Sequence, residues 1–476
     1  MTGDNAERVT EATVGEYTVD VPAEGSTVED PPNGGFRAWL VVSLSAAINF
    51  MLAIIVLLIG FGLLITTGSE EDIDLDEDER TEIFEHFTNL SNAYSIFAAL
   101  FMVRYGYRKT VVFGALVFAC TLLVLANVRK EAKDFIKLCF YCPAAMGSSF
   151  ILLGSLIPVL EYFSTKRRRA LLIVRVCTYM AQLLAAGLFF ADKIRDSFYW
   201  RTAFLGAMAL CVGIGILGMF LKDLKLTMNE SPSRNTKISF VQRALGVHVL
   251  ALFKNGLFYG LISLFFFFQL GANPLDSVFQ DNDFQEHIGA TSSIGTTIAY
   301  ALVPFIGLIL GSLLAWILNK VAAYPSEEFP LFRMIAILVG GASFVLGVAS
   351  FIATNATFGY GFTFRLLYAI CIAYIDMLRD DSIPKMFGPT NTRVVEGFVL
   401  LVVGVAGIIA TEITGDIDEW QYDFVFCGAM LLLTAIGTGV ILVLVLFVFD
   451  KGNRVRPLAA SGNSRCFPQS SPNHAG

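Results

Sequence analysis

One arginine is conspicuous in a long apolar part of the sequence, because an ionisable side chain inside such a segment costs free energy and is a candidate for function. Arg365 lies about five residues inside the apolar segment 360–377. A guanidinium can hold a carboxylate through two parallel hydrogen bonds, so Arg365 is our candidate anchor for an anionic ligand. The alternative is a structural role, in which the side chain reaches outward or pairs with a helix end.

Asp376 follows Arg365 in the same segment, eleven residues further on. Eleven steps of about 100° return a helical residue to nearly the same face, so both side chains are expected on one face. They lie about 16 Å apart along the axis and cannot form a salt bridge. Asp376 is a candidate gate or proton site, and an ion pair with Arg379 or Arg393 is the alternative.

Polar side chains recur at helical spacing in other apolar segments, where they must face protein or water rather than lipid. In segment 170–191 this stripe includes Arg175, Tyr179 and Gln182. Cavity lining and hydrogen bonding between helices are equally open roles for it, and Arg175 could simply reach the cytoplasm. The candidate substrate-binding residues are Arg365, Tyr179, Gln182, Asn255, Tyr259, Thr297, Tyr300 and Asn49.

The composition is typical of a membrane protein. Of 476 residues, 55% are hydrophobic and only 16% are charged, which leaves too many apolar runs for a water-facing surface. The formal net charge is −7, and the acidic residues concentrate in the N-terminal tail and in a loop at 69–82. No basic face typical of a nucleic-acid-binding protein is present, so nucleic acid is not an expected partner.

Twelve apolar segments approach the length of about 20 residues that spans a bilayer. A polar, basic stretch at 222–246 separates six of them from the other six, which is typical of two-lobed proteins with a site between the lobes. The predicted helices are 36–64, 83–103, 111–127, 137–163, 170–191, 200–221, 247–270, 291–318, 332–352, 360–377, 393–413 and 424–449. We therefore expect an all-α membrane protein with a disordered acidic tail (1–36), a six-helix bundle (37–221), a central loop (222–246), a second six-helix bundle (247–449) and a tail (450–476).

The distribution of lysine and arginine predicts the orientation in the membrane. With both termini in the cytoplasm, roughly 23 basic residues face the cytoplasm and roughly eight face the outside. The loops after 247–270, 332–352 and 393–413 contain no lysine or arginine. Because no retention motif closes the sequence, the plasma membrane is the default location.

Neither a metal site nor an enzyme is expected. Most of the eight cysteines lie in apolar segments, as is typical of small buried hydrophobic residues. Cys139 and Cys142 have redox or zinc spacing, but no second ligand pair accompanies them. The apolar segments contain no His-Glu-x-x-His motif, so we expect no catalytic residue, cofactor or metal.

Four motifs follow one another along the chain. Residues 32–42 read PNGGFRAWLVV, residues 161–170 read EYFSTKRRRA and residues 199–204 read YWRTAF, with Gly388-Pro389, Gly397 and Gly415-Asp416 after them. In order and spacing these motifs resemble the major facilitator superfamily and, within it, the monocarboxylate transporter family. The resemblance implies two six-helix bundles that rock about a site at the middle of the membrane.

The sequence also departs from that family. In the loop between the second and third helices, Arg104, Gly106 and Arg108 fit the pattern, but Val103 stands where aspartate is usual. The lysine of proton-coupled members has no counterpart in 49–64, and their Asp/Arg pair is absent from 291–318. These departures argue against lactate-type proton coupling. The candidate gating or coupling residues are Arg104, Gly106, Arg108, Arg175 and Asp376.

We therefore expect a secondary transporter that moves a small organic anion, such as a monocarboxylate, or a related solute by alternating access. One alternative is a pH-independent uniporter of neutral or aromatic solutes such as amino acids. Another is a transport-inactive receptor or scaffold that uses the acidic loop as its contact surface. The expected partners are a small solute with or without a proton, the lipid bilayer and, from the resemblance, a single-span accessory protein.

Overall fold

The structure is a computed structural model that describes almost all of the apolar part of the chain. The described residues are 34–64, 77–128, 132–189, 200–222, 252–253, 255–280, 282–291, 294–321, 328–353, 357–415 and 420–454, and they are nearly all helical. The predicted N-terminal tail, central loop and C-terminal tail lie largely outside these ranges.

The first half of the chain forms a bundle in which two predicted helices are interrupted. The predicted segment 83–103 is divided by a turn at Tyr94, and 137–163 contains a π-helical turn around Pro143. A wider turn accommodates a residue that lacks an N–H and crowds the preceding turn. The helices are α1 (Phe36–Leu64), α2 (Glu77–Ala93), α3 (Ser95–Tyr105), α4 (Tyr107–Asn127), α5 (Lys133–Cys139), η1 (Phe140–Ala144), α6 (Ala145–Tyr162), α7 (Arg167–Phe189) and α9 (Trp200–Met219).

The second half forms a similar bundle, with one correction to the predicted helix ends. The helices are α12 (Gly256–Gln280), α13 (Asn282–His287), α14 (Ile294–Val321), α15 (Glu328–Ala353), α16 (Phe358–Gly415) and α17 (Trp420–Arg454). The predicted end of the seventh helix at 270 is wrong, because α12 continues to Gln280. Its last turns contain polar residues that find partners inside the bundle: Asn273 donates to the carbonyl of Gly407 and Ser277 donates to Glu85.

Two predicted helices, 360–377 and 393–413, are joined in α16 by a sharp corner at Gly388. Its φ of 75° is a left-handed conformation that glycine adopts at little cost. The predicted end of the first of these helices at 377 is also wrong, because helical structure continues through Arg379, Asp380 and Asp381. Their charges looked like a helix end in the sequence, but all three form ion pairs in the bundle.

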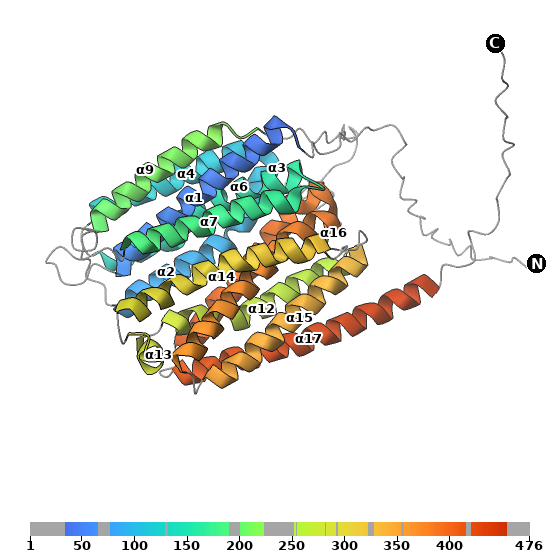
Figure 1. The fold of residues 1–476 in the computed structure, drawn as a ribbon. Helices are drawn as coiled ribbons and strands as arrows, with labels where there is room; N and C mark the ends of the chain where they lie inside the picture. Colours follow the sequence, from blue (N-terminus) through green and yellow to red (C-terminus); the bar gives the residue numbers. More distant parts are fainter. Residues whose placement is uncertain are drawn as a thin grey trace, which may run out of the picture.

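The two halves have separate hydrophobic cores and meet along a few helices. One core joins side chains of α1 to α9, with small contributions from α14 and α16, and the other joins those of α12 to α17. In Figure 1 the N-terminal helices (blue to green) form one layer and the C-terminal helices (yellow to red) the other. The layers touch where α7 contacts α14 and where α16 contacts α2, α3 and α6.

The outside of the bundle is apolar, as expected of a surface in contact with lipid. Large apolar side chains such as those of Phe97, Leu116, Ile337 and Ile436 are exposed there. Ten helices within the described residues are long and apolar enough to cross a membrane. The remaining two predicted segments overlap α2–α3 and α7, so every predicted segment has a helical counterpart, while the count of twelve crossings remains a prediction.

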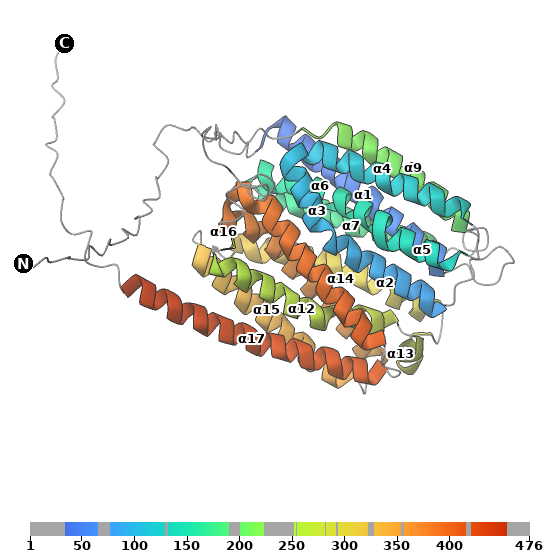
Figure 2. The same cartoon turned by 180° about the vertical axis from the view of Figure 1, so that it is seen from behind.

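The last helix differs from the others in length. α17 has 35 residues, and Figures 1 and 2 show that its C-terminal end projects beyond the other helices. The end from which it projects is also the end at which α3 meets α4 and α6 precedes α7 (Figure 2). That end carries the basic residues 104–109 and 166–169, and we call it the basic end.

Candidate functional site

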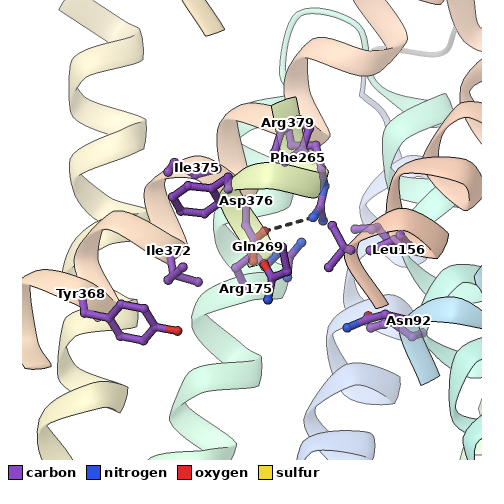
Figure 3. A pocket seen from close by; sticks show the side chains of 14 residues that line it. Asn92, Leu156, Arg175, Phe265, Gln269, Tyr368, Ile372, Ile375, Asp376 and Arg379 are labelled. Atoms are coloured by element: carbon purple, nitrogen blue, oxygen red, sulfur yellow. Dashed lines mark hydrogen bonds and ion pairs between the residues drawn. The ribbon is translucent and has the colours of Figure 1, made fainter. Parts of the chain in front are cut away.

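A cavity of about 180 Å³ lies between the two halves. The N-terminal half contributes residues of α2, α6 and α7, and the C-terminal half contributes residues of α12 and both arms of α16. Figure 3 shows several of these side chains converging on one space. The lining residues are Asn92, Leu152, Leu156, Arg175, Phe265, Phe268, Gln269, Tyr368, Ile372, Ile375, Asp376, Arg379, Leu400 and Val403.

The wall of the cavity combines apolar side chains with polar ones, among them two amides and a phenol. Tyr368 donates its hydroxyl proton to the carbonyl of Ala272 at 3.0 Å, and Gln269 donates to the Asn273 side chain at 3.1 Å. Asn92 faces them from α2, across the boundary between the halves. These groups can orient a polar ligand, and the apolar wall can take up a short hydrocarbon part.

One side of the cavity is charged. Arg175, Asp376 and Arg379 line it, and Asp380 and Glu396 lie immediately behind them with no exposed surface. We call these five residues the charge cluster. Arg379 contacts Asp376 at 3.0 Å, Asp380 at 2.9 Å and Glu396 at 3.1 Å, and Arg175 contacts Asp380 at 2.5 Å.

The charge cluster bridges the two halves of the protein. Arg175 is on α7, whereas the other four members are on α16. One guanidinium proton donor, Arg175 Nε, is buried without a hydrogen-bond acceptor among the described residues. An oriented guanidinium with a donor to spare, at the edge of a cavity, is suited to an anionic group.

Further ion pairs join the halves at the basic end. Arg393 on α16 contacts both carboxylate oxygens of Glu161 on α6, at 2.6 and 2.8 Å, and reaches the carbonyl of Met102 on α3. Arg168 on α7 contacts Asp381 on α16 at 2.6 Å. The cavity is therefore separated from the basic end by paired charges from both halves.

Different contacts join the halves at the opposite end, which we call the acidic end after Glu79, Glu82 and Glu85 of α2. Ser277 on α12 donates to Glu85 at 2.6 Å. His86 on α2 lies 3.1 Å from Glu412 on α16. The helices also approach closely, because a Cβ on Gly407 would lie 2.2 Å from the side-chain oxygen of Asn89.

Among the sequence-predicted residues, Arg175 and Asp376 line the cavity, and Asp376 forms the ion pair with Arg379 that was its alternative role. Tyr179 is buried and Gln182 half-buried on α7. Arg365 is buried away from the cavity lining, with its guanidinium 4.4 Å from the ring of Tyr300 and bonded to the carbonyl of that residue. The roles of all these side chains in substrate binding remain predictions.

The remaining candidates lie apart from the cavity lining. Asn49 bonds to Ser155 inside the N-terminal core, Asn255 caps the start of α12, and Tyr259 is half exposed on the outside of that helix. Thr297 is in α14, but its side chain is outside the described part. At the basic end, Arg104 and Arg108 are exposed, and Gly106 links α3 to α4 with a φ of 81°.

The site residues predicted from the sequence do not include Glu396, Asp380 or Gln269. Glu396 lies inside the predicted apolar helix 393–413, so the rule that selected Arg365 could have found it. Asp380 and Gln269 were assigned to loops or helix ends, because the predicted helices were too short.

The comparison with protein families identifies the class of the protein. Residues 90–388 match the Major Facilitator Superfamily, which is more than half of the chain, and the protein belongs to this superfamily. It is therefore a multi-pass membrane protein of a family that transports small solutes and whose members are generally not enzymes. No curated protein matches the sequence.

Solved structures share the fold. The proton:xylose symporter XylE of E. coli has a TM-score of 0.61 and 13% identity over 84% of this chain and 94% of that one. The nucleoside transporter NupG has a TM-score of 0.58 and 13% identity over 85% of this chain and 99% of that one. The fucose:proton symporter FucP of E. coli has a TM-score of 0.57 and 12% identity over 84% and 99%. At these identities the likeness concerns the fold, and the substrate has to be argued from the cavity.

Proposed function

We propose that the protein is a secondary transporter of small monocarboxylates, in which Arg175 holds the carboxylate in the cavity between the two halves. The observation that carries the proposal is the position of Arg175 at the cavity wall, with a buried donor that has no acceptor among the described residues. The proposal keeps the predicted orientation, with both termini in the cytoplasm and the plasma membrane as the location.

The shape and chemistry of the cavity support a substrate with one charged end. Arg175 and Arg379 provide positive charge on one side, and Leu156, Phe268 and Ile372 are among the apolar residues around the rest. A volume of about 180 Å³ suits a small molecule rather than an extended one. A short acid would place its carboxylate against Arg175 and its hydrocarbon part against the apolar wall.

A neutral polar solute is the second candidate. Both arginines of the cavity already contact carboxylates of the protein, which reduces their attraction for another anion. Asn92, Gln269 and Tyr368 offer the amide and hydroxyl groups that orient neutral ligands. The three structural neighbours carry names of sugar or nucleoside transporters, which agrees with this candidate but does not establish it.

Uptake measurements with two matched arginine variants test the proposal. Labelled lactate, pyruvate, neutral amino acids and sugars would be supplied to cells that express the wild type, Arg175→Lys or Arg365→Gln. A lysine keeps the positive charge but loses the planar donor array, and the loss of one charge-assisted hydrogen bond weakens binding by about tenfold or more. We expect Arg175→Lys to raise the KM for monocarboxylates by that factor.

Arg365→Gln is the control, because Arg365 is a buried arginine of the C-terminal half that does not line the cavity. It should leave the KM unchanged if both variants reach the membrane in equal amounts. Saturable uptake of a neutral solute, with no uptake of monocarboxylates, would reject the proposal in favour of the second candidate. If only Arg365→Gln raised the KM for monocarboxylates, Arg365 rather than Arg175 would be the residue that binds the carboxylate.

A further inference from the structure

One member of the charge cluster has a different environment from the rest. Glu396 has no exposed surface, and neither carboxylate oxygen accepts a hydrogen bond from the described residues. Among the described residues, its ion contact is with Arg379 Nε, at 3.1 Å. The Nε–H of Arg379 is directed at Asp380 instead, and the other two nitrogens of Arg379 donate to Asp380 and Asp376.

The charges of the cluster do not balance when every member is ionised. Asp376, Asp380 and Glu396 would carry three negative charges, against two positive charges on Arg175 and Arg379. One excess negative charge in a buried site is costly, and a second one, brought by a bound anion, would cost more unless one carboxylate took up a proton. Asp380 receives hydrogen bonds from both arginines and Asp376 receives one, so Glu396 is the carboxylate with least reason to stay ionised.

Among the described residues, the charged groups around Glu396 belong to the charge cluster or are already paired. The charged groups that act on it are Arg379, Asp380, Arg175 and Asp376. The nearby carboxylate of Glu161 on α6 is engaged by Arg393 through both oxygens. On the side of α3, Gly397 next to Glu396 packs against Ala99 and the carbonyl of Ser95.

We propose that Glu396 is the proton-binding site of this transporter and that its proton enters together with the substrate carboxylate. The inference rests on the proposed function. A carboxylate bound to Arg175 competes with Asp380 for that arginine, and Asp380 then depends more strongly on Arg379. Arg379 consequently stabilises an ionised Glu396 less, and the substrate adds a negative charge nearby.

Both effects favour the uptake of a proton by Glu396, which forms an O–H bond and neutralises that carboxylate. One proton then compensates one substrate charge, so that the charge of the cluster is the same before and after loading. By linkage, protonation of Glu396 must also tighten substrate binding by the same factor. The substrate anion and the proton would cross the membrane together, without net movement of charge.

The test uses purified full-length protein in lipid vesicles, with a pH-sensitive dye trapped inside. Addition of lactate to wild-type vesicles should acidify the lumen beyond the passive change in protein-free vesicles, and Glu396→Gln should lose that protein-dependent acidification. Exchange of labelled for unlabelled lactate at equal pH should persist in Glu396→Gln, because exchange needs no net proton transfer. Glu286→Gln, which removes an exposed carboxylate of α13, is the control and should leave both signals unchanged.

A second measurement reads the proton without transport. Infrared spectra of the reconstituted protein should show a protonated carboxyl band that changes with pH in the wild type and is lost in Glu396→Gln. Net uptake of lactate by wild-type vesicles without protein-dependent acidification of the lumen would overturn the inference and leave the proposed function intact. If the wild type exchanged no monocarboxylate, the proposed function would fail, and the presence or absence of the Glu396 band would decide the proton site separately.

Discussion

From the cavity to the basic end, the two halves are joined by three arginine–carboxylate pairs, one of them the Arg175–Asp380 pair of the charge cluster, whereas at the acidic end they are joined by a serine, a histidine and close helix packing. The three carboxylates of these pairs, Glu161, Asp380 and Asp381, are at most 3% exposed. At the acidic end, Glu412 is 69% exposed. Buried pairs are costly to separate because each partner would be left uncompensated, while exposed pairs contribute little.

The difference in burial between the contacts at the two ends implies that one end opens more readily than the other. Water already solvates part of the contacts at the acidic end, so less free energy is needed to separate the halves there. We expect the acidic end to open more readily than the basic end in the substrate-free protein. A thiol introduced by Leu156→Cys on the cavity wall can report this, because its reaction with an impermeant maleimide from either side measures access through each end.

Glu161→Gln should have the largest effect. It removes the carboxylate that holds Arg393 through two hydrogen bonds, and breaking a buried pair costs about 3–5 kcal/mol. We expect a lower unfolding temperature and faster labelling of Leu156→Cys from the basic end. Glu82→Gln is the control, because Glu82 is about half exposed and pairs with Lys137 in its own half. Equal labelling in both variants would contradict the role of this pair.

Ser277→Ala should weaken the acidic end by a smaller amount. A hydrogen bond to a charged group contributes about 1.5–3 kcal/mol, and Ser277 provides one to Glu85 across the boundary. Labelling of Leu156→Cys from the acidic end should rise. Ser350→Ala serves as the control, since its hydroxyl donates to the carbonyl of Leu346 in its own helix. If both serine variants gave the same labelling rate, the hydrogen bond to Glu85 would not hold this end closed.

Gly407→Ala should disturb the helix packing at the same end. The new methyl group would overlap the side chain of Asn89, and overpacking of this kind costs about 1–3 kcal/mol. The expected result is access from the acidic end at a rate between those of the wild type and Ser277→Ala. Gly437→Ala, with nothing within 4 Å of the added methyl group, should behave as the wild type. Unchanged labelling in Gly407→Ala would mean that α2 and α16 can separate slightly at no cost.

His86→Gln should have the smallest effect. Glutamine can still donate a hydrogen bond to Glu412, and an exposed ion pair contributes less than about 1 kcal/mol. Labelling from the acidic end should therefore change by less than in the other variants, at acidic as well as alkaline pH. A large effect confined to acidic pH would show that charged His86 closes this end, and would reverse the comparison between the two ends.

The fold could be predicted from the sequence because membrane helices are recognisable by their length and their apolar composition. Every predicted segment overlaps a helix, and the basic residues 104–109 and 166–169 lie together at one end. The errors concern helix ends. Ser277, Asp380 and Asp381 were too polar for lipid by composition, but each has a partner on another helix, which a single sequence cannot reveal.

The site was only partly predictable for a related reason. Arg365 and Asp376 share a helix and nearly a face, yet only Asp376 lines the cavity, because α14 packs Tyr300 against the Arg365 guanidinium. Whether a buried charged side chain faces the cavity depends on the helix that packs against it, and the spacing of residues within its own helix does not determine this. Arg175 shows the same dependence on a neighbouring helix. Because it is close to the basic residues of 166–169, its side chain could have reached the cytoplasm, but in the structure it pairs with Asp380 on α16.

The projecting last helix has a consequence for the kind of bilayer that surrounds the protein. At 1.5 Å per residue, the 35 residues of α17 extend about 52 Å, against about 30 Å for an average hydrocarbon core. The sequence stays apolar from residue 424 to residue 449, about 39 Å of helix. We expect such a helix to tilt strongly or to gather thicker lipid around it, because its apolar length exceeds the thickness of an average hydrocarbon core.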